Sequence, residues 1–338
     1  MFFYPLLVAA IISFILTPQV KKLAFKLGAV DYPNQRRINK EAIPNLGGIA
    51  IYAGVIITLI LLGYARDFLA ILVSGSLIFG LGILDDLYEL SALNKLVGQI
   101  VIALIAIVLG LQIQFITNPW GGMYYLGWLS VPITLVWLVG ITNTINLVDG
   151  LDGLAGGITI IASITLAIFA YQQGQILTVI LTLTVIGSTL GFLRYNFNPA
   201  QIFMGDTGSM FLGFMLGAIS ISGALKSVTV LTLLVVVLAL GIPIFDTLLS
   251  IIRRKLKGQP IFQADKNHFH HKLLALGLRQ FEVVLIIYLI SIFLSMVAIG
   301  VSLGTARETI FLLVSSLLFL VVGSFKLKKL NSKLTVEN

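Results

Sequence analysis

Eleven apolar runs, each close in length to a membrane-spanning helix, divide this 338-residue sequence almost from end to end. They lie near residues 2–20, 46–63, 68–84, 95–112, 128–142, 153–171, 175–193, 208–224, 228–250, 282–304 and 307–325. Because a bilayer hydrocarbon core takes about 20 apolar residues per helix, each run is a candidate span. Charged residues form 11% of the chain, whereas soluble domains carry about 25%. The pattern predicts an all-α, polytopic integral membrane protein with about 11 transmembrane helices.

An odd number of spans places the two termini on opposite sides of the membrane, and the basic residues decide which side is which. With the N-terminus outside and the C-terminus cytoplasmic, 19 of the 22 lysine and arginine residues fall in the cytoplasm. The chain is then a single transmembrane domain, 1–338, whose catalytic cytoplasmic loops are expected at 23–45, 85–95, 142–153, 194–208 and 251–281. The first residues, MFFYPLLVAA, lack a basic segment and a cleavage site, so they are expected to stay as a span.

The net charge of +8 is concentrated on the cytoplasmic side, which favours anionic membrane lipids and anionic substrates and argues against a nucleic acid partner. The chain has no cysteine, which excludes disulfides and thiolate metal sites. Candidate functional residues gather in the loops of this same side.

The segment NLVDGLDGLAGG, residues 146–157, places Asp149 and Asp152 between two uncharged runs. Acids in such surroundings are costly and usually functional. If the segment opens a helix, the two carboxylates share one face, and the helix N-terminus offers N–H groups to a phosphate. The alternative is that two Asp-Gly steps are simply turns between membrane helices.

Asp85 and Asp86 end the run at 68–84, and Glu89 follows them. Adjacent carboxylates repel unless a cation or a proton lies between them. Mg²⁺ prefers one or two carboxylates together with phosphate oxygens and water, so this acid pair suits a pyrophosphate substrate. The alternative is a set of solvated acids at a helix end.

Two further cytoplasmic loops carry glycines next to polar side chains. In the first, Lys40 precedes the pair Gly47-Gly48 and is placed to meet a phosphate or a base, whereas the arginines of that loop equally fit positive-inside anchors. In the fourth, the sequence GDTGS combines Asp206 with backbone N–H groups freed by glycine, as in an anion cradle. The alternative is a turn in which Asp206 is a helix N-cap.

The long run at 228–250 and the loop after it complete the set. Pro243 and Asp246 within the run predict a bent helix that forms the wall of a groove. The three histidines of the chain, His268, His270 and His271, fall within four residues and have lysines nearby. Imidazoles there are suited to hydrogen-bond phosphate oxygens, whereas a zinc site would need partners at a clear spacing.

Five motifs lie on one predicted membrane face, namely NLVDGLDGLAGG, FMGDTGS, an acid pair followed by a third acid, PNLGG and HFHH. Together they resemble the polyprenyl-phosphate N-acetylhexosamine-1-phosphate transferase family, of the glycosyltransferase 4 type, over about residues 28–280. The pattern His-x-His-His at 268–271 resembles the bacterial branch that transfers GlcNAc-1-phosphate to undecaprenyl phosphate and primes O-antigen, common-antigen or teichoic acid synthesis. The branch that makes the peptidoglycan precursor has three contiguous histidines.

The resemblance implies that a polyprenyl phosphate oxygen attacks the sugar-bound phosphorus of UDP-GlcNAc and releases UMP. It implies Mg²⁺ as cofactor with Mn²⁺ as a substitute, a site facing the cytoplasm of a bacterial plasma (inner) membrane, and a chain that could form a homodimer. The implied catalytic residues are Asp85, Asp86, Asp206, His268, His270 and His271, and the implied metal ligands are Asp206, Asp86 and Asp85. The implied substrate-binding residues are Lys40, Asn45, Asn146, Asp149, Asp152, Asn196, Phe203 and Ser209.

Two other functions stay open. One is transfer of phospho-MurNAc-pentapeptide, and the other is ion-coupled transport, in which acids should lie near the bilayer midplane rather than at cytoplasmic helix ends. Within the transferase hypothesis a single displacement is expected, because a polyprenyl phosphate, with a second pKa of about 6, is largely ionised near neutral pH. The role of Glu89, the polyprenyl chain length and the downstream polymer stay open.

Overall fold

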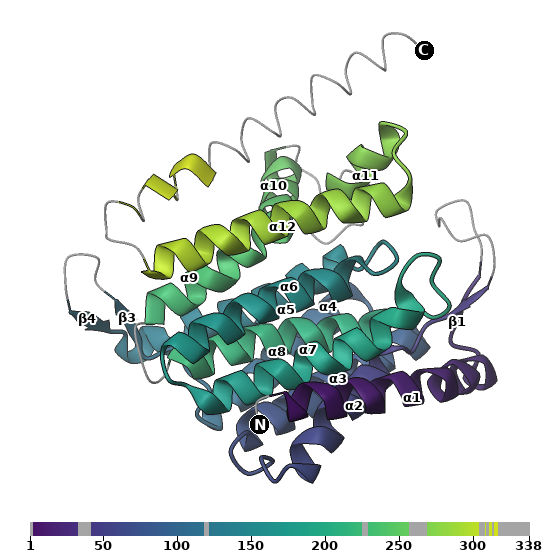
Figure 1. Ribbon diagram of the computed structural model, residues 1–338, viewed down its shortest axis with the longest axis horizontal. Helices are drawn as coiled ribbons and strands as arrows, with labels where there is room; N and C mark the ends of the chain where they lie inside the picture. Colours follow the sequence, from purple (N-terminus) through teal and green to yellow (C-terminus); the bar gives the residue numbers. More distant parts are fainter. Residues whose placement is uncertain are drawn as a thin grey trace.

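The computed structural model describes residues 3–32, 42–117, 122–224, 229–256 and 269–303, together with 308, 311–312 and 314–316. Most of the described residues are helical (Figure 1). The helices are α1 Tyr4–Leu27, α2 Gly48–Leu61, α3 Leu69–Tyr88, α4 Ala92–Val108, α5 Ser130–Val148, α6 Leu154–Gln172, α7 Ile176–Asn196, α8 Gly205–Ala224, α9 Thr229–Ala239, α10 Gly241–Leu256, α11 Phe269–Ala275 and α12 Gln280–Leu303. A single 3₁₀ turn, Gly127–Leu129, leads into α5.

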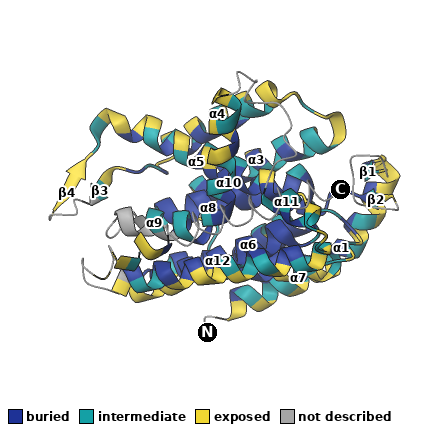
Figure 2. Ribbon diagram, turned by 90° about the horizontal axis from the view of Figure 1, so that it is seen from above, coloured by how far each residue is buried: buried dark blue, intermediate teal, exposed yellow. Residues whose placement is uncertain are grey.

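The helices support the prediction of a multi-pass membrane protein. Within the described residues, six helical segments are long and apolar enough to cross a bilayer: α1, α3, the 3₁₀ turn with α5, α6, α7 and α12. Helices α2 and α4 are apolar but shorter. Exposed residues lie on the outward faces of the helices and buried residues on the inner faces (Figure 2). Many of the exposed side chains are large and hydrophobic, as expected where lipid replaces water around the bundle. The last predicted run, 307–325, lies mostly outside the described residues, so the count of eleven spans and the sides of the termini stay predictions.

The run at 228–250 is not one bent helix, and in this the sequence prediction is wrong. Helix α9 ends at Ala239 and α10 begins at Gly241, so the helix is interrupted at Leu240. Pro243 lies three residues further on, in the first turn of α10. The reason is that proline has no N–H to donate to the carbonyl four residues earlier, which here belongs to Ala239. Regular bonding resumes at Ile244, whose N–H donates to Leu240 O at 2.9 Å.

Two short hairpins depart from the all-α prediction. Strands β1 (Val30–Asp31) and β2 (Ile43–Pro44) pair antiparallel, as do β3 (Phe115–Thr117) and β4 (Met123–Tyr125). The first hairpin lies at the same end of the bundle as α11, and the second lies at the opposite end (Figure 1). The β1–β2 hairpin thus lies at the end of the bundle where the predicted site loops lie.

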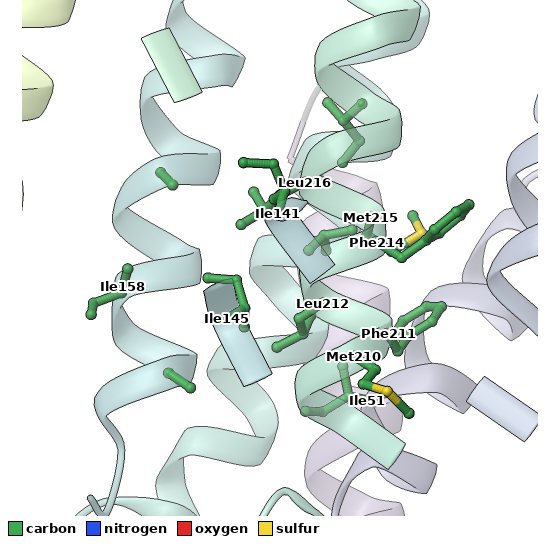
Figure 3. Close-up of a cluster of buried hydrophobic side chains, with 14 of the residues drawn as sticks. Ile51, Ile141, Ile145, Ile158, Met210, Phe211, Leu212, Phe214, Met215 and Leu216 are labelled. Carbon is green, nitrogen blue, oxygen red and sulfur yellow. The ribbon is translucent and has the colours of Figure 1, made fainter. Parts of the chain in front are cut away.

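Helix α8 forms the centre of the bundle. It packs against α2, α3, α5, α6, α7 and α9. Its apolar side chains Phe211, Leu212, Phe214 and Met215 are almost fully buried, with residues of α2, α5 and α6 around them (Figure 3). The first turn of α8 is therefore surrounded by the ends of other helices, and it is there that the polar residues meet.

Glycines allow this close approach. A Cβ atom on Gly48 of α2 would lie 2.2 Å from the backbone nitrogen of Gly208 in α8. A Cβ atom on Gly82 of α3 would lie 2.5 Å from Cα of Thr207. Backbone atoms cannot move away from such a contact as a flexible side chain can. Glycine at these positions therefore allows α2 and α3 to pack directly against the first turn of α8.

Candidate active site

The N-terminus of α8 is capped by a side chain from α3. The Asp86 carboxylate accepts hydrogen bonds from the N–H groups of Asp206 (2.8 Å) and Thr207 (2.9 Å) and from the Thr207 hydroxyl (2.5 Å). Asn45 Nδ2 adds a fourth bond of 3.4 Å. A Cβ atom on Gly205, whose φ is 71°, would lie 2.5 Å from Asp86 Oδ2. The GDTGS motif is therefore a helix N-terminus, but its cap is Asp86, and Asp206 lies within the first turn.

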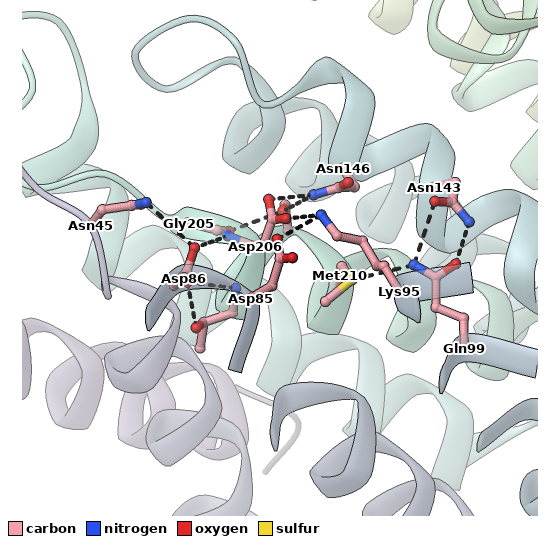
Figure 4. A network of polar contacts seen from close by, with 12 residues as sticks. Asn45, Asp85, Asp86, Lys95, Gln99, Asn143, Asn146, Gly205, Asp206 and Met210 are labelled. Atoms are coloured by element: carbon pink, nitrogen blue, oxygen red, sulfur yellow. Dashed lines mark hydrogen bonds and ion pairs between the residues drawn. The ribbon is translucent and has the colours of Figure 1, made fainter. Parts of the chain in front are cut away.

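Asp206 points into a cluster to which three other helices contribute (Figure 4). Asn146 Nδ2 of α5 donates to Asp206 Oδ1 at 2.7 Å and to Ser209 Oγ at 2.9 Å. The Lys95 ammonium of α4 pairs with Asp206 Oδ2 and, at 2.6 Å, with Asp85 Oδ2 of α3. Asp85 Oδ1 is buried and has no hydrogen-bond partner. Acids that are far apart in the sequence thus meet around one ammonium group.

Lys95 is the functional candidate that reasoning from the sequence missed. In the sequence it is one of the 19 lysine and arginine residues that the predicted orientation places in the cytoplasm. Its side chain is 18% exposed and contacts two carboxylates, which an orienting surface charge would not do. A signal was available: Lys95 stands in the first turn of an otherwise uncharged helix that directly follows the acid pair.

The loop between α5 and α6 holds the two acids of NLVDGLDGLAGG, and it corrects an expectation. Helix α5 ends at Val148, with Asp149 as its C-cap, and α6 begins only at Leu154, so neither Asp149 nor Asp152 opens a helix or shares a helical face with the other. Gly153, with φ of 77°, is in the left-handed conformation, so the backbone is not helical at this position. The alternative reading, turns between membrane helices, is correct for the backbone.

Asp152 and Asn196 join this loop to the segment before α8. Asp152 Oδ2 accepts hydrogen bonds from Asn198 Nδ2 (3.1 Å) and from the Ala200 N–H (2.9 Å). Asn196, only 3% exposed, accepts from the Gly153 N–H at 3.1 Å and donates to Ile202 O at 2.9 Å. The amide of Asn196 is therefore engaged on both sides with the protein itself. This geometry favours a structural role for Asn196 over the predicted contact with a substrate.

Asn45 and Phe203 lie on neighbouring backbone segments. They form an isolated parallel β-bridge, in which the Phe203 N–H donates to Pro44 O at 2.8 Å. The carbonyl of Phe203 accepts from the Gly47 N–H at 2.9 Å. The segment after β2 is thereby fixed beside the entry to α8, which places Asn45 against Asp86.

Helix α11 brings two histidines to the loop after α5. His270 is 6% exposed, and a Cβ atom on Gly150 would lie 3.2 Å from its Nε2. The rings of His270 and His271 have centroids 4.3 Å apart. Asp246 of α10 accepts a hydrogen bond from the Phe269 N–H at 3.0 Å, which ties the start of α11 to α10. The predicted residues His268 and Lys40 lie outside the described residues.

Electrostatics single out Asp149 among the acids of the loops. Burial raises the pKa of its carboxyl well above the usual range, and the carboxylates of Asp206 and Asp86 raise it further. Asp149 thus belongs electrostatically to the same cluster as these two acids. Across the described part of the chain, no group of three or more histidine, aspartate or glutamate side chains has the arrangement of a ready metal cage.

Comparison with known proteins identifies relatives that match this chain over most of its length. Residues 68–224 match the model of glycosyl transferase family 4. The chain is 44% identical to the probable undecaprenyl-phosphate N-acetylglucosaminyl 1-phosphate transferase of Bacillus subtilis, over 94% of this chain and 89% of that protein. It is 36% identical to the decaprenyl-phosphate N-acetylglucosaminephosphotransferase of Mycobacterium tuberculosis, over 84% and 78%. It is 32% identical to the phospho-N-acetylmuramoyl-pentapeptide-transferase of Bacillus subtilis, over 87% and 94%.

Proposed function

Because the chain belongs to glycosyl transferase family 4, we propose that it transfers GlcNAc-1-phosphate from UDP-GlcNAc to undecaprenyl phosphate, which primes a cell-surface polysaccharide. The observation that carries this proposal is the meeting of Asp85, Asp86 and Asp206 with Lys95 at one end of the helical bundle. A charged cluster at a helix end suits a phosphate reaction at the membrane surface, where a lipid phosphate and a water-soluble nucleotide can both arrive.

In the proposed reaction an oxygen of the lipid phosphate attacks the phosphorus that carries the sugar. The bond from that phosphorus to the bridging oxygen of UMP breaks, UMP leaves with the electron pair, and an undecaprenyl-pyrophosphoryl sugar forms. The acceptor is already anionic, so the protein has to orient it and offset charge rather than remove a proton. An acceptor that is already ionised favours a single displacement over a phospho-sugar enzyme intermediate.

Asp85 and Asp206 have the chemistry to hold a divalent cation. Asp85 Oδ1 is a buried carboxylate oxygen without a partner, and Asp206 has two further oxygens, which contact the side chains of Asn146 and Lys95. Hard oxygen ligands of this kind suit Mg²⁺, and Mn²⁺ as a substitute. When bound, the ion would offset the charge that develops on the pyrophosphate oxygens. Asp86 fits less well as a ligand, because its oxygens accept hydrogen bonds from the start of α8, and we assign it a positioning role.

The other residues divide between the two substrates. Asn146 fixes the rotamer of Asp206, while His270 and His271 lie beside the loop after α5, where they can donate hydrogen bonds to phosphate oxygens. Asp149 and Asp152 belong to the nucleotide side.

The proposed site faces the cytoplasm of the bacterial plasma membrane, and the chain could act as a homodimer. The charge distribution of the sequence supports this orientation. UDP-GlcNAc is preferred as donor over the muramyl-pentapeptide nucleotide on two grounds, the His-x-His-His pattern and the higher identity, 44% against 32%, to a protein named for N-acetylglucosamine.

Purified protein with UDP-GlcNAc, undecaprenyl phosphate and Mg²⁺ should release UMP and form the pyrophosphoryl lipid. A chelator should abolish the reaction, Mg²⁺ or Mn²⁺ should restore it, and Ca²⁺ should support less turnover because its coordination shell is larger and looser. Full activity in the chelator would disprove the metal role. If the muramyl-pentapeptide nucleotide outcompetes UDP-GlcNAc in a mixed reaction, the donor assignment is wrong although the family is right.

A further inference from the structure

Lys95 holds the position that a cation between two acids would take. Its ammonium lies between Oδ2 of Asp85 and Oδ2 of Asp206, in the first turn of α4 (Figure 4). The side chains of Lys95, Asp85 and Asp206 are 18%, 10% and 27% exposed, so water screens this contact only in part. The ammonium therefore neutralises much of the repulsion between the two carboxylates.

A divalent ion on these two acids cannot share that position with the ammonium. Lys95 Nζ lies 2.6 Å from Asp85 Oδ2, whereas Mg²⁺ binds carboxylate oxygens at about 2.0–2.1 Å with water or phosphate in its other positions. An ion at that distance from both Oδ2 atoms would overlap the ammonium, and an ion held by Asp85 Oδ1 would share that carboxylate with the ammonium and repel its charge. Asp206 cannot turn away freely, because Asn146 holds its other oxygen at 2.7 Å.

We infer that Lys95 is an internal competitor for the divalent cation. This inference rests on the proposed metal role of Asp85 and Asp206. The ion binds only when the ammonium withdraws, so the affinity of the protein for metal alone is low. The withdrawn ammonium stays tethered to α4 beside the acid pair, where it can pair with an anionic diphosphate. By linkage, metal and diphosphate then strengthen each other's binding.

The test is a titration of the full-length protein in detergent micelles with Mn²⁺ alone, using the electron paramagnetic resonance signal of free Mn²⁺. Lys95→Met and Lys95→Gln should each bind Mn²⁺ at least about tenfold more tightly than the unchanged protein, because a unit charge next to the ligands has been removed. Lys22→Met removes an equal charge from an exposed position on α1 and should leave the affinity unchanged. Equal or weaker binding by both Lys95 variants would overturn the inference.

Asp85→Asn separates this inference from the proposed function. If Asp85→Asn weakens Mn²⁺ binding while the Lys95 variants do not tighten it, the metal site stands and the competition is refuted. If Asp85→Asn has no effect on Mn²⁺ binding, the proposed metal site itself is wrong, and the inference fails with it.

Thermal unfolding gives a second readout, which also covers a variant that folds poorly. Without metal, Lys95→Met should unfold at a lower temperature than the unchanged protein, because Asp85 and Asp206 then repel each other. Mn²⁺ should raise its midpoint by more than it raises that of the unchanged protein. A smaller rise would count against the competition.

UDP should increase Mn²⁺ affinity less in Lys95→Met than in the unchanged protein, after correction for the Mn²⁺–UDP complex. An equal increase in the two proteins would refute the coupling between metal and diphosphate.

Discussion

At the scale of single residues, two adjacent acids have different surroundings. Asp86 accepts three hydrogen bonds from the start of α8, whereas Asp85 contacts Lys95 through one oxygen and leaves the other buried without a partner. The difference follows from helix geometry: neighbouring side chains on a helix point about 100° apart, so α3 directs one carboxylate at α8 and the other at α4. Adjacent acids therefore need not share a task.

Substitution of each acid should separate the two tasks. Asp86→Ala should lower the free energy of unfolding by about 2 kcal/mol or more, because buried N–H and hydroxyl donors lose their acceptor. Asp85→Asn should cost less stability but lower turnover at least about 100-fold, since a ligand and its charge are lost. Thermal unfolding and UMP release measure the two effects. Equal losses of stability in both variants would contradict the division.

Asp152→Asn should weaken UDP-GlcNAc binding, because Asp152 is proposed on the nucleotide side and organises the loop after α5. The carboxylate accepts from Asn198 and from the Ala200 N–H, so its loss also loosens the segment before α8. Calorimetric titration with UDP-GlcNAc measures the affinity, and Asp85→Asn serves as the matched control whose nucleotide affinity should stay near that of the unchanged protein. If both variants showed one profile of binding and turnover, the assignment of Asp152 to the nucleotide would have to be given up.

At the scale of helices, the site depends on how closely α3 can approach α8. The two chain segments touch through Gly82 and the backbone of Thr207, one turn away from the acid pair. A glycine in a helix costs conformational entropy, so its presence here is explained by packing and not by helix propensity. The distance from Asp86 to the start of α8 is set by this contact.

Gly82→Ala should therefore destabilise the protein by about 2–3 kcal/mol and reduce UMP release, because the new Cβ overlaps backbone atoms. The control lies on the same helix: a Cβ atom on Gly80 would meet nothing within 4 Å. Gly80→Ala should be neutral or stabilising by up to about 1 kcal/mol. Thermal unfolding of the two variants side by side measures the contrast, and an equal loss in Gly80→Ala would mean that helix packing is not the cause.

At the scale of the whole molecule, the acid cluster lies beside the β1–β2 hairpin, because Asn45, which follows β2, contacts Asp86. This hairpin and the β3–β4 hairpin lie at opposite ends of the bundle (Figure 1). In the proposed orientation, which the charge distribution of the sequence supports, Asp85, Asp206 and the loop after α5 lie at the cytoplasmic end. This separation argues against a transporter, whose ion-binding acids should lie near the middle of the spans. It also predicts which residues an external reagent can reach.

The absence of native cysteine allows a direct test of orientation. Tyr124→Cys on β4, which replaces a side chain that is 59% exposed, should react in intact cells with a maleimide that does not cross membranes. Tyr88→Cys at the end of α3, where the side chain is 72% exposed, should react only after permeabilisation. Labelling in the reverse order would invert the proposed topology and move the site to the outer face.

The sequence by itself determined the class, a mostly helical multi-pass membrane protein, since apolar runs of span length admit few other structures, and its short motifs predicted most of the polar residues that meet at the start of α8. It also indicated the family, through motifs that follow one another in a set order along the chain, and the similarity to known proteins shows that family. Tertiary structure alone decided the rest. The role of Lys95 depends on the packing of α4 beside α3 and α8, which the sequence does not give. The roles of Asp85 and Asp86 differ only because the two side chains face different neighbours. Likewise, the sequence alone does not tell whether the amide of Asn196 binds a substrate or, as in the structure, hydrogen-bonds to the protein backbone. The physical reason is that hydropathy is a property of each segment, whereas the partner of a buried polar group is set by contacts between segments far apart in the chain.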